Sequence, residues 1–180
     1  DIVIPFNNEA LNLKILLPKL LKVLKKIKFL RFRLIFIDDG SDDKGSDIIN
    51  KFKNKHKFIY ILKHKNKLGQ TQSYKSYFKK YKSEYFIRMD ADNQDDPVNI
   101  LKLVEPIKRR YGLILTERKL RKHSIYMVVL TFLYNKLISL LAKKKLSNYS
   151  SSLACFNRKY IPYKNLKNND HRYLPIIAID

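Results

Sequence analysis

The sequence is poor in the residues that define several protein classes. Its 180 residues include one cysteine, no tryptophan and four glycines. The single Cys155 excludes an intramolecular disulfide framework and fits a reducing compartment. Hydrophobic residues make up 45% of the chain and charged residues 30%. That composition is typical of a globular protein and excludes a largely disordered chain.

Acidic residues are also scarce, with 16 Asp and Glu against 38 Lys and Arg, which gives a net charge of +22. Such a charge predicts affinity for an anionic partner: nucleic acid, a lipid surface or phosphorylated substrates. The alternative is a general drift in residue usage, because the basic residues are mostly lysine and because asparagine and isoleucine are abundant too. The lysines would then merely coat the surface. Composition leaves both explanations open.

Long apolar runs and terminal signals are missing as well. The chain opens on Asp1 without an initiator methionine or a signal-peptide pattern, so we expect a piece of a longer protein, truncated at both ends. Its length predicts one domain over residues 1–180. The apolar run Ile125–Ala142 is shorter than the roughly 20 residues of a membrane-spanning helix, and it contains Lys136. With its basic flanks, region 119–145 is a candidate membrane-interface segment, and a core helix on the sheet is the alternative.

Strands and helices alternate along most of the sequence. Short apolar runs predict strands, and apolar residues at helical spacing predict the helices between them. The predicted strands are Ile2–Ile4, Leu34–Ile37, Phe58–Leu62, Tyr85–Met89 and Leu113–Leu115, and the predicted helices are Ala10–Lys28, Ser46–Phe52, Thr71–Tyr81 and Val98–Tyr111. This alternation predicts an α/β fold with a mostly parallel sheet flanked by helices.

An acidic segment follows the fourth predicted strand, at the edge where such sheets bind ligands. Asp90 and Asp92 are two residues apart, so in extended backbone both side chains point the same way, and the amide oxygen of Gln94 is close behind. Hard oxygen donors of this kind suit Mg²⁺ or Mn²⁺, which would keep open positions for substrate phosphates. The alternative is a solvated acidic turn, which a lone pair of aspartates does not exclude.

Four motifs, in this order and spacing, resemble those of family 2 glycosyltransferases. They are Val3-Ile4-Pro5-Phe6-Asn7-Asn8-Glu9, Ile37-Asp38-Asp39-Gly40-Ser41-Asp42, Gly69-Gln70 and Met89-Asp90-Ala91-Asp92-Asn93-Gln94. Together with Asn148-Tyr149 and the tail Arg172–Ala178, they are most similar to the polyprenyl-phosphate branch, which includes dolichol-phosphate mannosyltransferase and the undecaprenyl-phosphate aminoarabinose-type transferases. The resemblance covers essentially the whole chain. It implies a nucleotide-diphospho-sugar transferase fold of the GT-A type.

The resemblance also implies a role for individual positions. It assigns nucleotide binding to Pro5, Asn7, Glu9, Ile37, Asp39, Asp90, Ala91, Asp92, Gln94 and Arg118. Within this set, Asp90, Asp92 and Gln94 would hold Mg²⁺ or Mn²⁺, and Asp90, Asp92 and Arg118 would serve catalysis. A planar arginine fork suits a phosphate group. Alternatively, Asp39 and Glu9 cap the helices that follow them, and Arg118 is one basic residue among many.

The activity implied is the metal-dependent, inverting transfer of a sugar from a GDP- or UDP-sugar to an undecaprenyl or dolichyl phosphate. We expect it at the cytoplasmic face of a membrane, with an anionic membrane surface as a further partner. Two alternatives remain: transfer to a saccharide hydroxyl in cell-envelope polysaccharide synthesis, and a catalytically inactive relative. Nucleic acid is not expected as a partner, because the lysines are spread along the chain and the acidic segments 38–43 and 90–96 would repel a phosphate backbone.

The chain departs from the family pattern at several positions. Asn7 stands where the family usually has Tyr, Tyr77 where it has Gly, Met127 where it has a second phosphate-binding Arg, Asn148 where it has Asp, and Ser152 where it often has Gly. We expect Tyr77 to change the packing of its helix. The amide of Asn148 cannot act as a general base, but a lipid phosphate is already ionised near neutral pH and needs none. A phosphate acceptor therefore tolerates this change better than a hydroxyl acceptor does.

Overall fold

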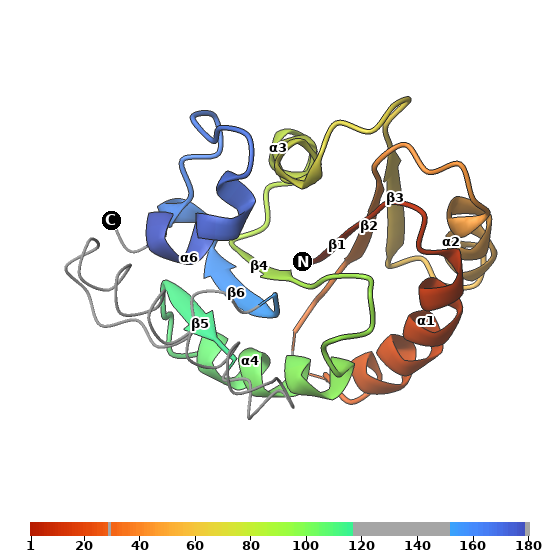
Figure 1. Ribbon diagram of the computed structural model, residues 1–180. Coiled ribbons are helices and arrows are strands. Elements are labelled where there is room, and N and C mark those ends of the chain that lie inside the picture. The colour runs from red at the N-terminus through yellow and green to blue at the C-terminus, as the bar shows by residue number, and fades with distance from the viewer. Residues whose placement is uncertain (29, 117–151, 179–180) are drawn as a thin grey trace, which may run out of the picture.

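The computed structural model describes residues 1–28, 30–116 and 152–178 (Figure 1). Within these residues, six strands form one sheet in the order β3-β2-β1-β4-β6-β5. The strands are β1 (Ile2–Phe6), β2 (Leu34–Asp38), β3 (Ile59–Lys63), β4 (Tyr85–Arg88), β5 (Leu113–Leu115) and β6 (Ala154–Asn157). Strands β1 to β4 pair in parallel, whereas β6 is antiparallel to both β4 and β5. The predicted mostly parallel α/β fold is confirmed.

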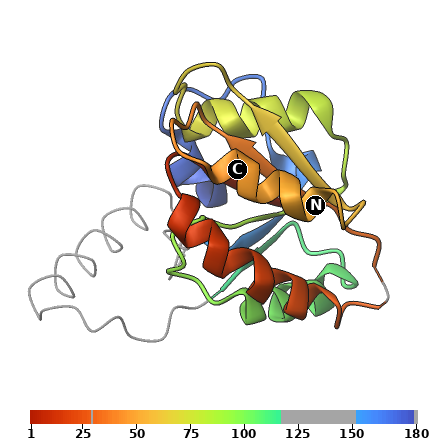
Figure 2. The ribbon, with the colours of Figure 1, turned by 90° about the vertical axis from the view of Figure 1, so that its right-hand side faces the viewer.

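Helices cover both faces of this sheet, as the two views in Figures 1 and 2 show. The helices are α1 (Ala10–Leu24), α2 (Gly45–Lys53), α3 (Gln70–Lys80), α4 (Ile100–Ile107) and α6 (Leu174–Ile177), with short 3₁₀ turns at Pro97–Asn99, Arg158–Tyr160 and Asp170–Tyr173. Helices α1, α2 and α4 contribute to the core on one face. Helices α3 and α6 contribute to the core on the other face.

The first two strands show why the sheet forms where it does. Every residue of β1 and β2 is buried, as expected for parallel strands that are covered on both sides. Because side chains alternate along a strand, Ile2 and Ile4 pack into the core beneath α1, whereas Val3 packs into the core beneath α3. A continuous apolar run in the sequence therefore serves two separate cores.

Helix α1 follows from its pattern of leucines. Its buried residues are Leu13, Leu16, Leu17, Leu20, Val23 and Leu24, and its lysines face solvent. Pro18 lies inside the helix on the exposed side without interrupting it, so the kink or restart that a proline suggests does not divide α1. The helix ends at Leu24 rather than at the predicted Lys28.

On the opposite face, aromatic side chains fill the space between α3 and the sheet. Tyr77 is fully buried, its ring lies 5.7 Å from that of Phe86, and its hydroxyl donates a hydrogen bond of 3.0 Å to Asp1 Oδ2. Phe86 in turn stacks on Phe156 of β6, with ring centroids 5.0 Å apart. Helix α3 thus packs on the sheet through the large ring of Tyr77, and a change in packing relative to the family stays a prediction.

Strand β6 was not predicted, and helix α4, like α1, ends earlier than predicted. Strand β6 lies within a segment that gave no clear pattern, and it inserts between β4 and β5. The predicted helix Val98–Tyr111 begins as a 3₁₀ turn, and its α-helical part ends at Ile107. Arg110 has a φ of +58°, which an α-helix does not accommodate. No helix within the described residues is long and apolar enough to cross a membrane. The candidate membrane-interface region 119–145 lies outside them.

Candidate functional site

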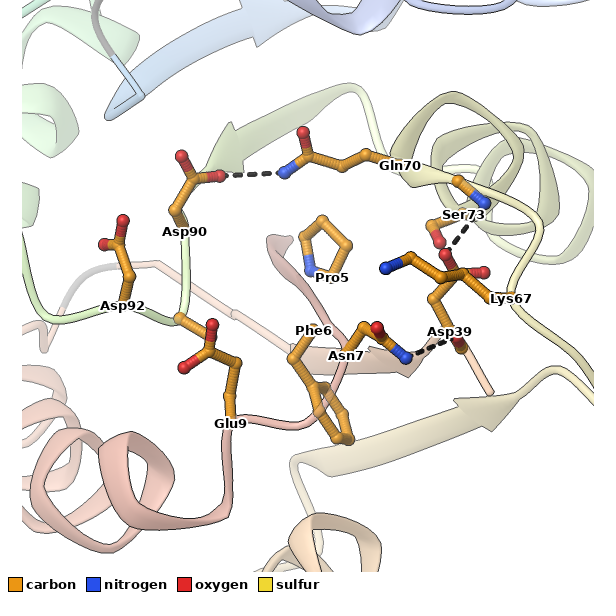
Figure 3. Close-up of a pocket in the computed structure, with 12 residues that line it drawn as sticks. Pro5, Phe6, Asn7, Glu9, Asp39, Lys67, Gln70, Ser73, Asp90 and Asp92 are labelled. Carbon is orange, nitrogen blue, oxygen red and sulfur yellow. Dashed lines mark hydrogen bonds between the residues drawn. The ribbon is translucent and has the colours of Figure 1, made fainter. Parts of the chain in front are cut away.

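A pocket of about 340 Å³ opens where β1, β2 and β4 end (Figure 3). Its lining residues are Pro5, Phe6, Asn7, Glu9, Asp39, Lys67, Gly69, Gln70, Ser73, Asp90, Ala91 and Asp92. They come from β1 and the residues after it, the residue after β2, the loop before α3, the start of α3 and the loop after β4. The carboxyl ends of parallel strands are the usual ligand-binding edge of an α/β sheet, and the predicted site lies at this edge.

Asp39 organises one end of the pocket. It follows β2 and is 4% exposed. Its Oδ1 accepts hydrogen bonds from Leu68 N at 2.9 Å and from His64 Nδ1 at 2.8 Å, and its Oδ2 accepts one from Gly69 N at 2.8 Å. The carboxylate therefore holds the loop between β3 and α3. It does not cap α2, whose N-terminal Gly45 N is bound by Asp43 instead.

Asn7 ties a third segment to this end. Its Nδ2 donates hydrogen bonds to Asp39 O at 2.9 Å and to Gly40 O at 3.2 Å. Gly40 has a φ of +69°, and a Cβ there would collide with the backbone of Asn66 and Lys67. Only glycine permits this approach, so the segments after β1 and β2 and the loop after β3 are locked together. The amide of Asn7 thus takes a structural role where an aromatic ring is usual in the family.

Asp90 lies at the opposite end of the pocket. Its Oδ1 accepts a hydrogen bond of 2.9 Å from Gln70 Nε2, which fixes the carboxylate against the start of α3 (Figure 3). Burial raises the pKa of Asp90 above its ordinary value, although the nearby Arg88 guanidinium and the Gln70 hydrogen bond oppose the shift. A carboxylate that is poorly solvated as an anion is stabilised when a cation binds to it.

Asp92 lines the same pocket as Asp90, whereas the third predicted metal ligand does not. The side chain of Gln94 is exposed and absent from the pocket lining, and its backbone N donates a hydrogen bond of 3.0 Å to Asp92 Oδ1. Within the described residues, no group of three or more His, Cys, Asp or Glu side chains could hold a metal ion. Mg²⁺ is commonly bound through one or two carboxylates plus substrate phosphates. Asp90 and Asp92 fit that type of site.

Glu9 and Ile37 occupy different environments. Glu9 lines the pocket and stands at the N-cap position of α1, but its side chain makes no capping hydrogen bond. Its Oε2 instead accepts from Asn12 Nδ2 at 2.5 Å, and Ala10 N is bound by Asp43 at 2.7 Å. Ile37 is fully buried in β2 and does not line the pocket. Glu9 is therefore available to a ligand, and Ile37 would act only through its backbone.

The structure thus gathers most of the predicted nucleotide-binding residues around one cavity. The predicted residues that line it are Pro5, Asn7, Glu9, Asp39, Asp90, Ala91 and Asp92. Arg118 lies outside the described residues, as do Met127 and Asn148. The assigned binding roles of all these side chains stay predictions.

Several lining residues were not predicted. Phe6 was part of a motif but received no role, and the same holds for Gly69 and Gln70. Lys67 and Ser73 were missed altogether. Lys67 lies in a lysine-rich loop where no pattern distinguishes it, and Ser73 comes one turn after Gly69, on the inner side of α3. Helical spacing from Gln70 was the only available signal for Ser73.

The chain is similar in sequence to curated bacterial proteins. Over 180 residues the chain is 27% identical to the undecaprenyl-phosphate 4-deoxy-4-formamido-L-arabinose transferase of Photorhabdus laumondii, covering 99% of this chain and 55% of that protein. The enzyme of the same name from Pectobacterium atrosepticum is also 27% identical, over 99% of this chain and 54% of its own length. The chain therefore spans about half the length of these curated relatives.

Solved structures support the fold. A mannosyltransferase from Pyrobaculum calidifontis in complex with GDP-Man and Mn²⁺ superposes with a TM-score of 0.65 at 14% identity, over 97% of this chain and 50% of that one. Glucosyl-3-phosphoglycerate synthase from Mycobacterium tuberculosis in complex with UDP superposes with a TM-score of 0.66 at 16% identity, over 88% of this chain and 56% of that one. The sheet and its helices are thus those of GT-A type glycosyltransferases.

The sequence profile described as Glycosyl transferase family 2 matches residues 1–162, which is most of the chain. The pocket of the chain lies at the carboxyl ends of the parallel strands, and Asp39, Asp90 and Asp92 line it. The chain belongs to glycosyl transferase family 2.

Proposed function

We propose that the protein transfers a sugar from a nucleotide-sugar donor to a polyprenyl phosphate at a membrane surface, with divalent metal and with inversion at the anomeric carbon. One observation carries the proposal: a single cavity joins the ordered Asp39 end to the paired carboxylates Asp90 and Asp92. It has room for a small ligand. The names of the curated relatives, which specify undecaprenyl phosphate, support the choice of acceptor.

Each end of the cavity has a distinct task in this proposal. The segments that Asn7 and Asp39 hold together form a rigid wall for the nucleoside. Gln70 orients the carboxylate of Asp90. Asp90 and Asp92 would hold Mg²⁺ or Mn²⁺, which would supply positive charge to offset that of the diphosphate. Arg118 remains the predicted second cation for the same group.

The acceptor phosphate needs no general base, because it is ionised near neutral pH. It attacks the anomeric carbon from the side opposite the leaving diphosphate, so a single displacement inverts the configuration. We place the reaction at the cytoplasmic face of the membrane, where lysines near an anionic leaflet contribute about 1 kcal/mol of attraction each.

A transfer assay tests the proposal. The protein is incubated with radiolabelled UDP- and GDP-sugars and undecaprenyl phosphate, with Mn²⁺ or with EDTA, and the label is followed into organic solvent. We expect metal-dependent label in the lipid fraction, and its loss in Asp92→Ala. Label that appears only in water-soluble saccharide would assign a hydroxyl acceptor instead. No transfer from any donor by the folded protein would favour an inactive relative.

A further inference from the structure

Lys67 is a charged residue of the pocket to which the sequence analysis assigned no role. It extends from the loop between β3 and α3, and Figure 3 shows its side chain reaching into the space between Pro5 and Asp39. Within the described residues, no hydrogen bond or ion pair engages its ammonium group. Its backbone is well placed, since the neighbouring Leu68 N and Gly69 N are both bound by Asp39. A cation without an ion-pair partner is therefore held on an anchored loop.

The charge balance of the pocket makes this cation important. The lining contains four carboxylates, those of Glu9, Asp39, Asp90 and Asp92, and Lys67 is the only basic side chain among the described lining residues. A nucleoside diphosphate carries several negative charges of its own. It would be repelled from such a pocket unless bound cations offset the charge. A divalent metal at Asp90 and Asp92 supplies part of that compensation, and Lys67 is the protein group placed to supply more.

The start of α3 adds to the same wall of the pocket. Its N-cap is Gly69, with a φ of +91° and no side chain to cap the first turn. Uncapped N–H groups at a helix N-terminus attract anions. Ser73 in this first turn is fully buried, and its hydroxyl has no hydrogen-bond partner in the structure. Both residues line the pocket beside Lys67, and of their donors the Ser73 hydroxyl is the one left without a partner, since Gly69 N is bound by Asp39.

We propose that Lys67 is a donor-binding residue that contacts the phosphate oxygens of the nucleoside diphosphate, next to the uncapped start of α3. This inference rests on the proposed function and names a further residue of its donor site. Lys67 is not a metal ligand, so its contribution remains when the metal is removed. It acts in substrate binding, together with whatever charge the metal adds.

Calorimetric titration tests the assignment with UDP, GDP and inorganic pyrophosphate as probes, with and without Mn²⁺. The variants are Lys67→Gln, Lys67→Arg and the matched control Lys65→Gln, which removes an exposed lysine of the same loop that does not line the pocket. We expect Lys67→Gln to weaken both diphosphate and pyrophosphate binding about tenfold to a hundredfold, the range for losing a charged hydrogen-bonding group. Lys67→Arg should recover most of the affinity, and Lys65→Gln should bind as the unaltered protein does.

The three probes distinguish a failure of the Lys67 assignment from a failure of the proposed function. Equal affinities in Lys67→Gln and Lys65→Gln would overturn the assignment of Lys67. Weaker binding of nucleotides with unchanged pyrophosphate affinity would also overturn it, since Lys67 would then contact the nucleoside. If the unaltered protein bound neither UDP nor GDP, the proposed function would fail, while the pyrophosphate titrations would still decide whether Lys67 is an anion contact. Circular dichroism of each variant confirms that the fold is retained.

Discussion

Replacing Asp39 by asparagine should destabilise the protein and impair the pocket together. In Asp39→Asn, one of the two acceptor oxygens becomes an NH₂ group. With the remaining oxygen at the Oδ1 position, the Leu68 and His64 donors, at 2.9 and 2.8 Å, share one neutral oxygen, and the part-buried N–H of Gly69 faces the new NH₂ group. A hydrogen bond to a charged group contributes about 1.5 to 3 kcal/mol, and an unsatisfied buried donor costs about 1 to 3 kcal/mol.

From these values we expect Asp39→Asn to lower the free energy of unfolding by about 2 to 4 kcal/mol. A domain of this kind has a total stability of about 5 to 15 kcal/mol, so the variant should still fold. Urea denaturation followed by circular dichroism at pH 7 measures the loss as a lower midpoint with an unchanged slope. Nucleotide affinity should fall as well, because the loop that carries Lys67 and Gly69 loses its anchor.

The matched control is Asp42→Asn, an exposed aspartate in the same segment, for which we expect a change within about 0.5 kcal/mol. A loss in Asp39→Asn no larger than in this control would refute the reasoning. It would mean that the Asp39 carboxylate does not stabilise the loop between β3 and α3. Normal stability with abolished nucleotide binding would instead give Asp39 a direct ligand contact.

Three further changes probe the core and the charged groups. Burial raises the pKa of Asp90, so the protein loses stability as pH rises through that pKa and the carboxylate ionises. Asp90→Asn should therefore unfold at a higher urea concentration than the unaltered protein at pH 7, and it should lose metal-dependent nucleotide binding. Burial lowers the pKa of His171 to about 4, so stability should decline as pH falls from 6.5 toward 4, and urea midpoints of His171→Gln should lack this decline. Tyr77→Gly should lower the free energy of unfolding by about 3 to 5 kcal/mol in the same assay, because it empties a fully buried site.

Local patterns predicted the parallel half of the fold. The leucines of α1 and the apolar run of β2 identify their elements because helical and strand periodicities are properties of adjacent residues. Strand β6 did not follow, since its place depends on antiparallel pairing with β4 and β5, which are separated from it by about 70 and 40 residues. The end of α4 was also missed, because Arg110 adopts a positive φ that could not be predicted from the residue type.

The site divides in the same way. The positions of Asp90 and Asp92 after a strand could be predicted from their spacing, and the structure places both in the pocket. The hydrogen bonds of Asp39 could not, because Leu68 and Gly69 lie about 30 residues further along the chain. Lys67 is equally hidden, since only folding distinguishes it from the other lysines of the chain.

The most direct measurement is calorimetric titration of the protein with UDP and GDP, with and without Mn²⁺, repeated on Asp92→Ala. The donor site proposed here predicts that one of the two nucleotides binds, that Mn²⁺ strengthens the binding, and that Asp92→Ala abolishes the metal effect. Nucleotide binding that is equally strong in EDTA and in Asp92→Ala would contradict the metal site. Absence of binding by either nucleotide to the folded protein would contradict the donor site itself.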